Sequence, residues 1–220
     1  MPRAEDQSFA GVRRLGLFGG SFDPVHVGHL HVARAALEAG ELERIVFVPA
    51  ARPPHKPDRV LAEGAERLAM VELAIAGQPE YSTSALELER TGPSYSVDTV
   101  RELRGRLGLD PELELRLIIG WDNLVGLDRW REVDALFELA PPIVILRDGV
   151  GEDVLAGLRT GLAPATAARL EAGLVRGPTV DVSSTDLRER LLRGEDGGDL
   201  LPAGVGEYAA ARGIYRSTPC

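Results

Sequence analysis

The chain has 220 residues, 44% of them hydrophobic, and 25 Lys and Arg against 34 Asp and Glu give it a net charge of −9. A chain of this length can bury the core of one large domain, and a second complete domain is not expected. The acidic balance argues against a general binder of nucleic acid or of acidic membranes. The single cysteine, Cys220, excludes an internal disulfide framework and is typical of the reducing cytoplasm.

Residues 1–12 are mostly polar and predict a disordered N-terminal extension, and 13–220 are expected to form a single domain. No signal peptide and no run of membrane-spanning length is evident, so a cytoplasmic location is expected. Strand-like apolar runs alternate with helical patterns along the chain. That alternation predicts an α/β fold of the Rossmann-like type, a doubly wound parallel sheet with helices on its faces.

The predicted elements follow one another with short connections. Strands are expected at 15–18, 44–49, 81–90, 113–119 and 141–147. Helices are expected at 27–39, 64–77, 97–107 and 204–212, with a short helix ending near 127 and another ending at 192. Residues 151–173 are rich in Ala and Leu and weakly helical, and they carry no functional signal.

The stretch 15–31, LGLFGGSFDPVHVGHLH, predicts phosphate chemistry. A buried strand leads into Gly19 and Gly20, which allow close approach of a ligand, and then into a helix. A helix N-terminus behind such a turn binds anions, because its unpaired N–H groups and its dipole point at the same place. His26 and His29 stand there three residues apart, a spacing that aims both imidazoles to one side.

Other interpretations of this stretch have less support. A tight turn with capping histidines is the ordinary explanation of a lone Gly-Gly pair. A metal site at His26, His29 and His31 lacks a neighbouring cysteine. The motifs of dinucleotide-binding loops and of P-loops are both absent. A phosphate-binding turn with two histidines in place of a lysine therefore remains.

Polar residues also follow two later strands. The segment ARPPHKP at 51–57 is too rich in proline for helix or strand and is most simply a stiff surface loop. It nevertheless follows the carboxyl end of a strand, where open α/β sheets bind ligands, and it carries Lys56. Asp122, just after Gly120, suits the binding of ribose hydroxyls and equally suits a helix cap.

Three further features allow both a structural and a functional interpretation. Ser94 and Ser96 are suitable caps for the helix at 97–107. Trp130, taken alone, is more typical of a core than of a ligand platform. The segment VSSTDLR at 182–188 is a second strand-to-helix junction, whose hydroxyls either cap the helix or, with Arg188, hold phosphates.

These motifs together resemble a known family. GGSFDPVHVGH at 19–29 is similar to the signature of the (T/H)xGH nucleotidyltransferases and, within them, of the bacterial nicotinate-nucleotide adenylyltransferase family. PPHK at 53–56, GPSYS at 92–96, IIGWD at 118–122, Trp130 and VSSTDLR follow in the family's order, so the resemblance covers 15–215. The chain departs from the pattern at Ser96, where threonine is usual, and at Arg147-Asp148-Gly149, where Arg-Pro-Gly is common.

The resemblance implies transfer of the adenylyl group of ATP to nicotinate mononucleotide, giving deamido-NAD and pyrophosphate, with Mg²⁺ accompanying ATP and no metal site in the protein. The implied catalytic residues are His26, His29 and Arg188. The residues implied to bind ATP and phosphates are Gly19, Gly20, Ser21, Phe22, Lys56, Gly120, Asp122, Ser183, Ser184 and Thr185. Those implied to bind the nicotinate ring are Tyr95, Ser96 and Trp130.

Two alternatives belong to different classes of function. A related adenylyl- or cytidylyltransferase would use another acceptor, such as nicotinamide mononucleotide or phosphopantetheine, but GPSYS and Trp130 suit an aromatic acid. A non-catalytic nucleotide sensor would not need the complete polar set at both helix starts. Small-molecule substrates are the expected partners, without nucleic acid or membrane, and a homo-oligomer is left open.

Overall fold

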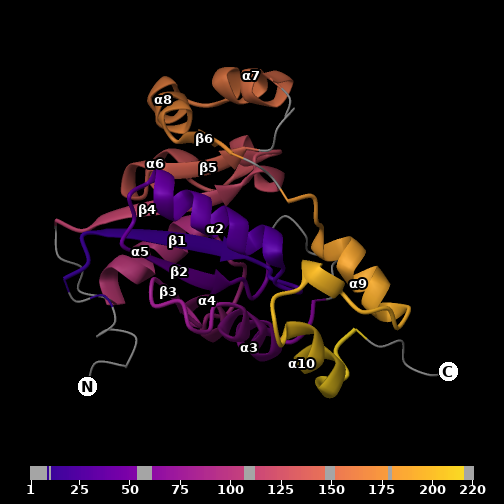
Figure 1. Cartoon of the computed structure of the whole chain (residues 1–220). Coiled ribbons are helices and arrows are strands. Elements are labelled where there is room, and N and C mark those ends of the chain that lie inside the picture. The colour runs from indigo at the N-terminus through magenta and orange to yellow at the C-terminus, as the bar shows by residue number, and fades with distance from the viewer. Residues whose placement is uncertain are drawn as a thin grey trace.

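The computed structural model describes residues 9, 11–53, 61–106, 112–146, 152–177 and 180–215. Its centre is a six-stranded sheet with the strand order β3-β2-β1-β4-β5-β6 (Figure 1). Every neighbouring pair in that sheet is parallel. The order and the direction of the strands confirm the predicted Rossmann-like, doubly wound fold.

Helices and strands alternate along most of the chain. The strands are β1 (Arg14–Gly20), β2 (Arg44–Pro49), β3 (Tyr81–Thr83), β4 (Glu114–Gly120), β5 (Pro142–Leu146) and β6 (Leu174–Arg176). The α-helices are α2 (Val27–Ala39), α3 (Gly64–Ala74), α4 (Leu86–Glu89), α5 (Ser96–Arg106), α6 (Val133–Leu139), α7 (Glu152–Gly161), α8 (Pro164–Ala172), α9 (Ser184–Leu192) and α10 (Val205–Arg212). Among the described residues, the short 3₁₀ helices are η1 (Trp121–Asn123), η2 (Leu127–Arg129) and η3 (Gly198–Leu200).

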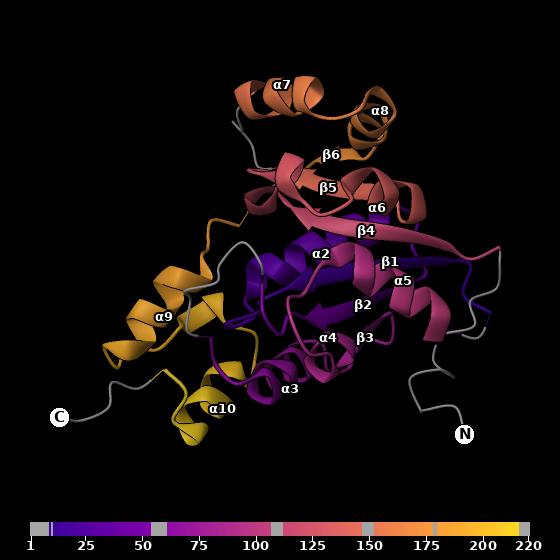
Figure 2. The same cartoon turned by 180° about the vertical axis from the view of Figure 1, so that it is seen from behind.

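Two helical layers enclose the sheet. Helices α2, α3 and α10 bury Ala33, Met70 and Val205 in one apolar cluster. Helices α5, α6 and α7 take part in the cluster on the other side; α2 covers the face seen in Figure 1, and α5 and α6 cover the face seen in Figure 2. Because both faces are covered, the central strands read as continuous apolar runs rather than as alternating ones.

The predicted strand at 81–90 is wrong after its third residue. β3 ends at Thr83, and the chain turns because the side-chain oxygen of Ser84 accepts a hydrogen bond from the N–H of Leu86 (3.3 Å). The residues that follow, LELE, are good helix formers and make the single turn of α4. The prediction also omitted α6 and β6, while the segment 151–173 forms α7 and α8 beside the β5–β6 edge.

The ends of the chain are described in part. Of the predicted disordered extension, residues 1–8 and 10 lie outside the described residues. Phe9 is 8% exposed and belongs to the cluster around α5 and β4, and Val12 packs against that cluster. Among the described helices, none is long and apolar enough to cross a membrane.

The strand order places the site. β1 pairs with β2 on one side and with β4 on the other, so the chain winds away from β1 in both directions. Ligands of open α/β sheets bind in the crevice that this reversal leaves beyond the carboxyl ends of the strands. β1 ends at Gly20 and β4 ends at Gly120, and both glycines therefore open into this crevice.

Candidate active site

The two histidines meet at the start of α2, as predicted. His26 is the N-cap residue, and its N–H donates a hydrogen bond to Nδ1 of His29 (3.2 Å). The two imidazole rings stack with their centroids 3.7 Å apart. Since Nδ1 of His29 accepts a hydrogen bond, the neutral ring carries its proton on Nε2, where it is a hydrogen-bond donor.

The ring of Phe22 packs against the ring of His29. The Phe22 side chain is fully buried, and its ring meets the ring of His29 edge-on at 5.0 Å between centroids. Phe18 and Phe47 pack against it on the remaining sides. Phe22 is among the residues predicted to bind ATP and phosphates, but its side chain packs against a histidine ring, so Phe22 can contact a phosphate only through its main chain.

The second predicted helix start docks against the first. A Cβ on Gly28 would lie 2.7 Å from Cγ1 of Val182, so only glycine allows this close approach. Ser184 donates a hydrogen bond from its hydroxyl to the carbonyl of Pro24 (3.2 Å). Ser183 caps α9, accepting hydrogen bonds from the N–H groups of Thr185 and Asp186, which confirms the predicted cap. The two helix N-termini are therefore held at one crevice.

Arg188 points to the loop that precedes α2. Its Nη1 donates to the carbonyl of Asp23 (2.7 Å) and lies 3.7 Å from the Asp23 carboxylate, and its Nη2 donates to the hydroxyl of Thr185 (3.1 Å). The Arg188 side chain is 16% exposed. In this arrangement the guanidinium fixes the loop to α9.

Asp23 is the centre of a buried polar cluster beside the turn at Gly19 to Ser21, which we call the glycine turn. Its side chain is fully buried, and Oδ1 accepts hydrogen bonds from the hydroxyl of Tyr215 (2.6 Å) and from the N–H of Ala62 (3.3 Å). Arg67, only 2% exposed, donates to the carbonyls of Ser21 (2.7 Å) and Ala62 (2.9 Å). We call Asp23, Arg67, Arg188 and Tyr215 the Asp23 clamp.

Sequence reasoning did not find the Asp23 clamp as a unit. Asp23 looks like an ordinary turn residue, and nothing close in sequence marks its partners, because Arg188 and Tyr215 lie 165 and 192 residues further on. The one available signal is a charged residue, Arg67, at a core position of the amphipathic helix α3.

The first of two adjoining cavities lies between the two helix starts. Most of the predicted phosphate and catalytic residues line it: Gly19, Gly20, Ser21, His26, His29, Gly120, Asp122, Ser183, Ser184 and Thr185. Its polar wall consists of hydroxyls, imidazoles and main-chain groups of glycine turns, together with the side chains of Asp122 and Asn123. Most of these groups can donate hydrogen bonds, so the cavity suits an anion with many oxygen acceptors. We call it the nucleotide cavity.

The second cavity opens on the other side of the glycine turn. Tyr95, Ser96 and Trp130, the predicted ring-binding residues, line it together with Glu87, Ser94 and Arg131, and we call it the acceptor cavity. Gly19, Gly20, Ser21 and Asn123 line both cavities. Groups bound in the two cavities would therefore meet at the glycine turn. Asn123, Glu87 and Arg131 had no predicted role.

Some predicted residues lie elsewhere. Lys56 and Arg147-Asp148-Gly149 lie outside the described residues. Arg188 is absent from the described walls of both cavities. The metal interpretation of His26, His29 and His31 finds no support in the described part of the chain, where no three His, Cys, Asp or Glu side chains are arranged to hold an ion.

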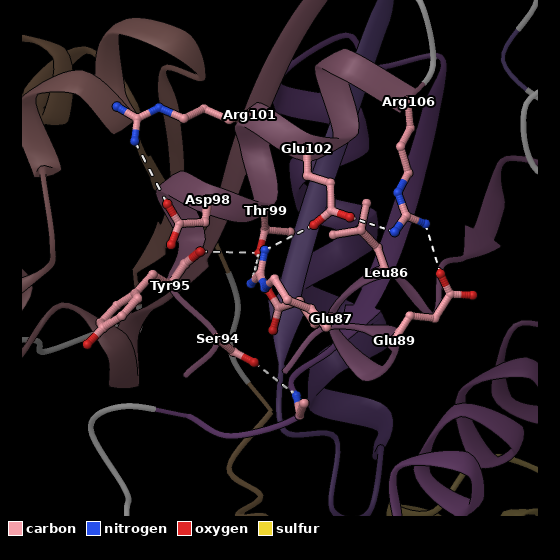
Figure 3. A network of polar contacts seen from close by, with 12 residues as sticks. Leu86, Glu87, Glu89, Ser94, Tyr95, Asp98, Thr99, Arg101, Glu102 and Arg106 are labelled. Carbon is pink, nitrogen blue, oxygen red and sulfur yellow. Dashed lines mark hydrogen bonds and ion pairs between the residues drawn. The ribbon is translucent and has the colours of Figure 1, made fainter. Parts of the chain in front are cut away.

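A polar network (Figure 3) includes Glu87, Ser94 and Tyr95, which line the acceptor cavity. Oε1 of Glu87, on α4, lies 2.5 Å from the hydroxyl of Thr99, on α5. The hydroxyl of Ser94 accepts hydrogen bonds from the N–H groups of Ala51 (3.0 Å) and Arg52 (3.2 Å). The loop after β2 is thereby tied to the segment that carries the predicted ring-binding residues.

The burial of Glu87 makes stability depend on pH. Burial raises the pKa of Glu87, and the hydrogen bonds of Thr99 and Ser94 and the charges of Arg90 and Arg67 oppose that rise. A group whose pKa is raised by folding stabilises the fold below its unfolded pKa, and this contribution is lost as the pH rises through the folded value. We expect Glu87→Gln to remove this dependence.

The measurement is urea denaturation of the wild type and of Glu87→Gln, from below the ordinary glutamate pKa to neutral pH. As the pH rises, the free energy of unfolding of the variant should increase relative to that of the wild type. A difference between the two proteins that stays constant across the series would contradict the prediction.

Comparison with known proteins gives a consistent result. The family model described as cytidylyltransferase-like matches residues 17–190. A relative from Thermomicrobium roseum, named "Probable nicotinate-nucleotide adenylyltransferase", is 40% identical over 93% of this chain and 92% of its own length. A relative of the same name from Dehalococcoides mccartyi is 35% identical over 92% of this chain and 97% of its own. In fold, the chain resembles a Plasmodium falciparum nicotinic acid mononucleotide adenylyltransferase complexed with NaAD, with a TM-score of 0.70 at 17% identity over 92% of this chain and 97% of that one.

Proposed function

This chain belongs to the nicotinate-nucleotide adenylyltransferases of the cytidylyltransferase-like family, and we propose that it joins ATP and nicotinate mononucleotide at the glycine turn between its two cavities. The reaction is an adenylyl transfer of NAD biosynthesis that yields deamido-NAD and pyrophosphate. The observation that carries the proposed site is the wall that the cavities share, Gly19 to Ser21 and Asn123.

In the proposed mechanism, ATP occupies the nucleotide cavity and nicotinate mononucleotide the acceptor cavity. A phosphate oxygen of the mononucleotide attacks the α-phosphorus of ATP in line. A new P–O bond forms as the bond from the α-phosphorus to the bridging oxygen breaks, and pyrophosphate leaves with the electron pair. The protein contributes position and charge stabilisation, because such a transfer requires little covalent chemistry from side chains.

The histidines act on the charge that develops. Nε2 of His29 donates a hydrogen bond to a phosphate oxygen as negative charge moves to the leaving pyrophosphate, and His26 assists from the adjacent stacked ring. Ser21, the hydroxyls of Ser183 and Thr185 and the main-chain N–H of Ser184 hold phosphate oxygens, and Asp122 accepts hydrogen bonds from the ribose. Arg188 contributes through the Asp23 clamp, where it fixes the loop before α2 to α9. Lys56 adds a positive charge from the loop after β2.

We propose Mg²⁺ as the ion that accompanies ATP. Asp122 is the one carboxylate among the described residues that line the nucleotide cavity, so the protein offers no complete set of oxygen ligands there. This donor set suits an ion carried by the triphosphate, which offsets the negative charge of ATP when bound. We also place the reaction in the cytoplasm, in keeping with the cysteine content of the chain.

Pyrophosphate release tests the function. Purified protein is supplied with ATP and Mg²⁺, and nicotinate mononucleotide and nicotinamide mononucleotide are offered in parallel at equal concentration. We expect fast release with the acid and slow release with the amide. Equal rates would remove the assigned acceptor, and ATP binding without release in either reaction would indicate a nucleotide sensor.

A further inference from the structure

The described wall of the acceptor cavity contains few side chains that can balance the charge of a bound acid. Among its described lining residues, Glu87 is the one acidic residue and Arg131 is the one basic residue. Glu87 is 6% exposed, and burial favours its neutral form. An acceptor whose ring bears a carboxylate brings a further negative charge into this cavity, and Arg131 is the cation on the described wall that can balance it.

Arg131 lies at the ring end of the cavity. Its Cζ is 4.8 Å from the centroid of the Tyr95 ring. Trp130, its neighbour in sequence, and Ser96, the first residue of α5, line the same cavity. The phosphate end is the wall at Gly19 to Ser21 that this cavity shares with the nucleotide cavity. An arginine among these groups can meet a planar aromatic acid.

The ion pairs of Arg131 leave its donors available for a ligand. Its Nη1 lies 3.7 Å from the carboxylate of Asp98, and its Nε lies 3.5 Å from that of Glu132. Both distances exceed those of ordinary hydrogen bonds. Arg101 has the same two partners and takes Glu132 at 2.6 Å. The Arg131 side chain is 52% exposed, so it can shift toward a bound carboxylate at little cost.

We propose that Arg131 is a specificity-determining residue that binds the ring carboxylate of the acceptor and thereby selects the acid over the amide. This inference rests on the proposed function and deepens it. The guanidinium binds the carboxylate in a bidentate manner, with two hydrogen bonds. A carboxamide offers a single oxygen acceptor, and its two N–H donors face the N–H donors of arginine unfavourably.

The test compares Arg131→Gln with a matched control, Arg159→Gln, which removes an exposed arginine from two other acidic partners, Glu152 and Glu171, outside the described cavity wall. For Arg131→Gln we expect kcat/KM for nicotinate mononucleotide to fall about tenfold, mainly through KM, with nicotinamide mononucleotide unchanged within about twofold. Arg131→Lys keeps the positive charge without the bidentate geometry of the guanidinium and should recover part of the loss. Arg159→Gln should keep the wild-type ratio.

Two results would overturn the proposal. Either the kcat/KM values of both acceptors stay at the wild-type level in Arg131→Gln, or both fall by the same factor, which would place Arg131 on a part that they share or in a purely structural role. Calorimetric titration of nicotinate mononucleotide into the wild type and Arg131→Gln supplies a readout without turnover. A wild type that binds the acid but releases no pyrophosphate would contradict the proposed function, and the affinity difference would still decide the role of Arg131.

Discussion

Replacing His29 by alanine is expected to lower kcat for pyrophosphate release by roughly 100- to 1,000-fold, the usual effect of removing one well-placed donor to developing charge. The KM for ATP should change far less, because the lost hydrogen bond strengthens only as charge moves to the leaving group. The fold should persist, since alanine is a good helix former at this position in α2 and the hydrogen bond that the ring accepts from the N–H of His26 contributes only modestly to stability.

Two further variants test which ring nitrogen acts. Nδ1 of His29 accepts the N–H of His26, so the donor assigned to catalysis is Nε2. The amide nitrogen of His29→Gln lies near the place of Nε2, and that of His29→Asn lies nearer the place of Nδ1. We expect His29→Gln to be about tenfold faster than His29→Ala and His29→Asn to be as slow as His29→Ala. Near-normal turnover by His29→Ala would remove the catalytic role.

Asp23→Ala is expected to lower the free energy of unfolding by about 3 kcal/mol, because it removes one partner of a buried charged network. Arg67, 2% exposed, and Arg188, 16% exposed, would lose the neighbouring carboxylate. The hydroxyl of Tyr215 and the N–H of Ala62 would lose their acceptor at the same time. Urea denaturation, followed by far-ultraviolet circular dichroism, measures the change.

Graded variants separate the parts of the Asp23 clamp. Tyr215→Phe removes one hydrogen bond and should cost about 1 kcal/mol. Glu41→Ala breaks an exposed ion pair with Arg14 and should cost under about 1 kcal/mol, so it reports the effect of losing a surface carboxylate. If Asp23→Ala cost no more than Glu41→Ala, the clamp would not be a source of stability.

The sequence predicts those parts of the site that depend on local signals. Gly19 and Gly20, the two histidines and the hydroxyls of 183–185 stand at strand-to-helix junctions, and parallel topology brings such junctions to one edge of a sheet. The residues at 95, 96 and 130 were assigned by resemblance, and they do share one cavity wall. The parallel direction of the strands follows from the alternation of strands and helices.

What the sequence does not predict depends on contacts between distant segments. Phe22 reads as part of a binding loop, and only packing against Phe18 and Phe47 makes it a buried support. The alternation of residues 81–90 suggests a strand, but the turn at Ser84 and the burial of Glu87 against Thr99 favour a helical turn. Tertiary contacts outweigh a weak local preference in both places.

The hydrogen bond between Asp23 and Tyr215 has a consequence for the order of events in synthesis and folding. It joins residues 192 positions apart, and contacts of such separation form slowly because a long loop must close first. Strands β1, β2, β4 and β5 are complete in the growing chain well before Tyr215 is added. The glycine turn, among the first segments to be translated, is therefore among the last to be held in its final shape.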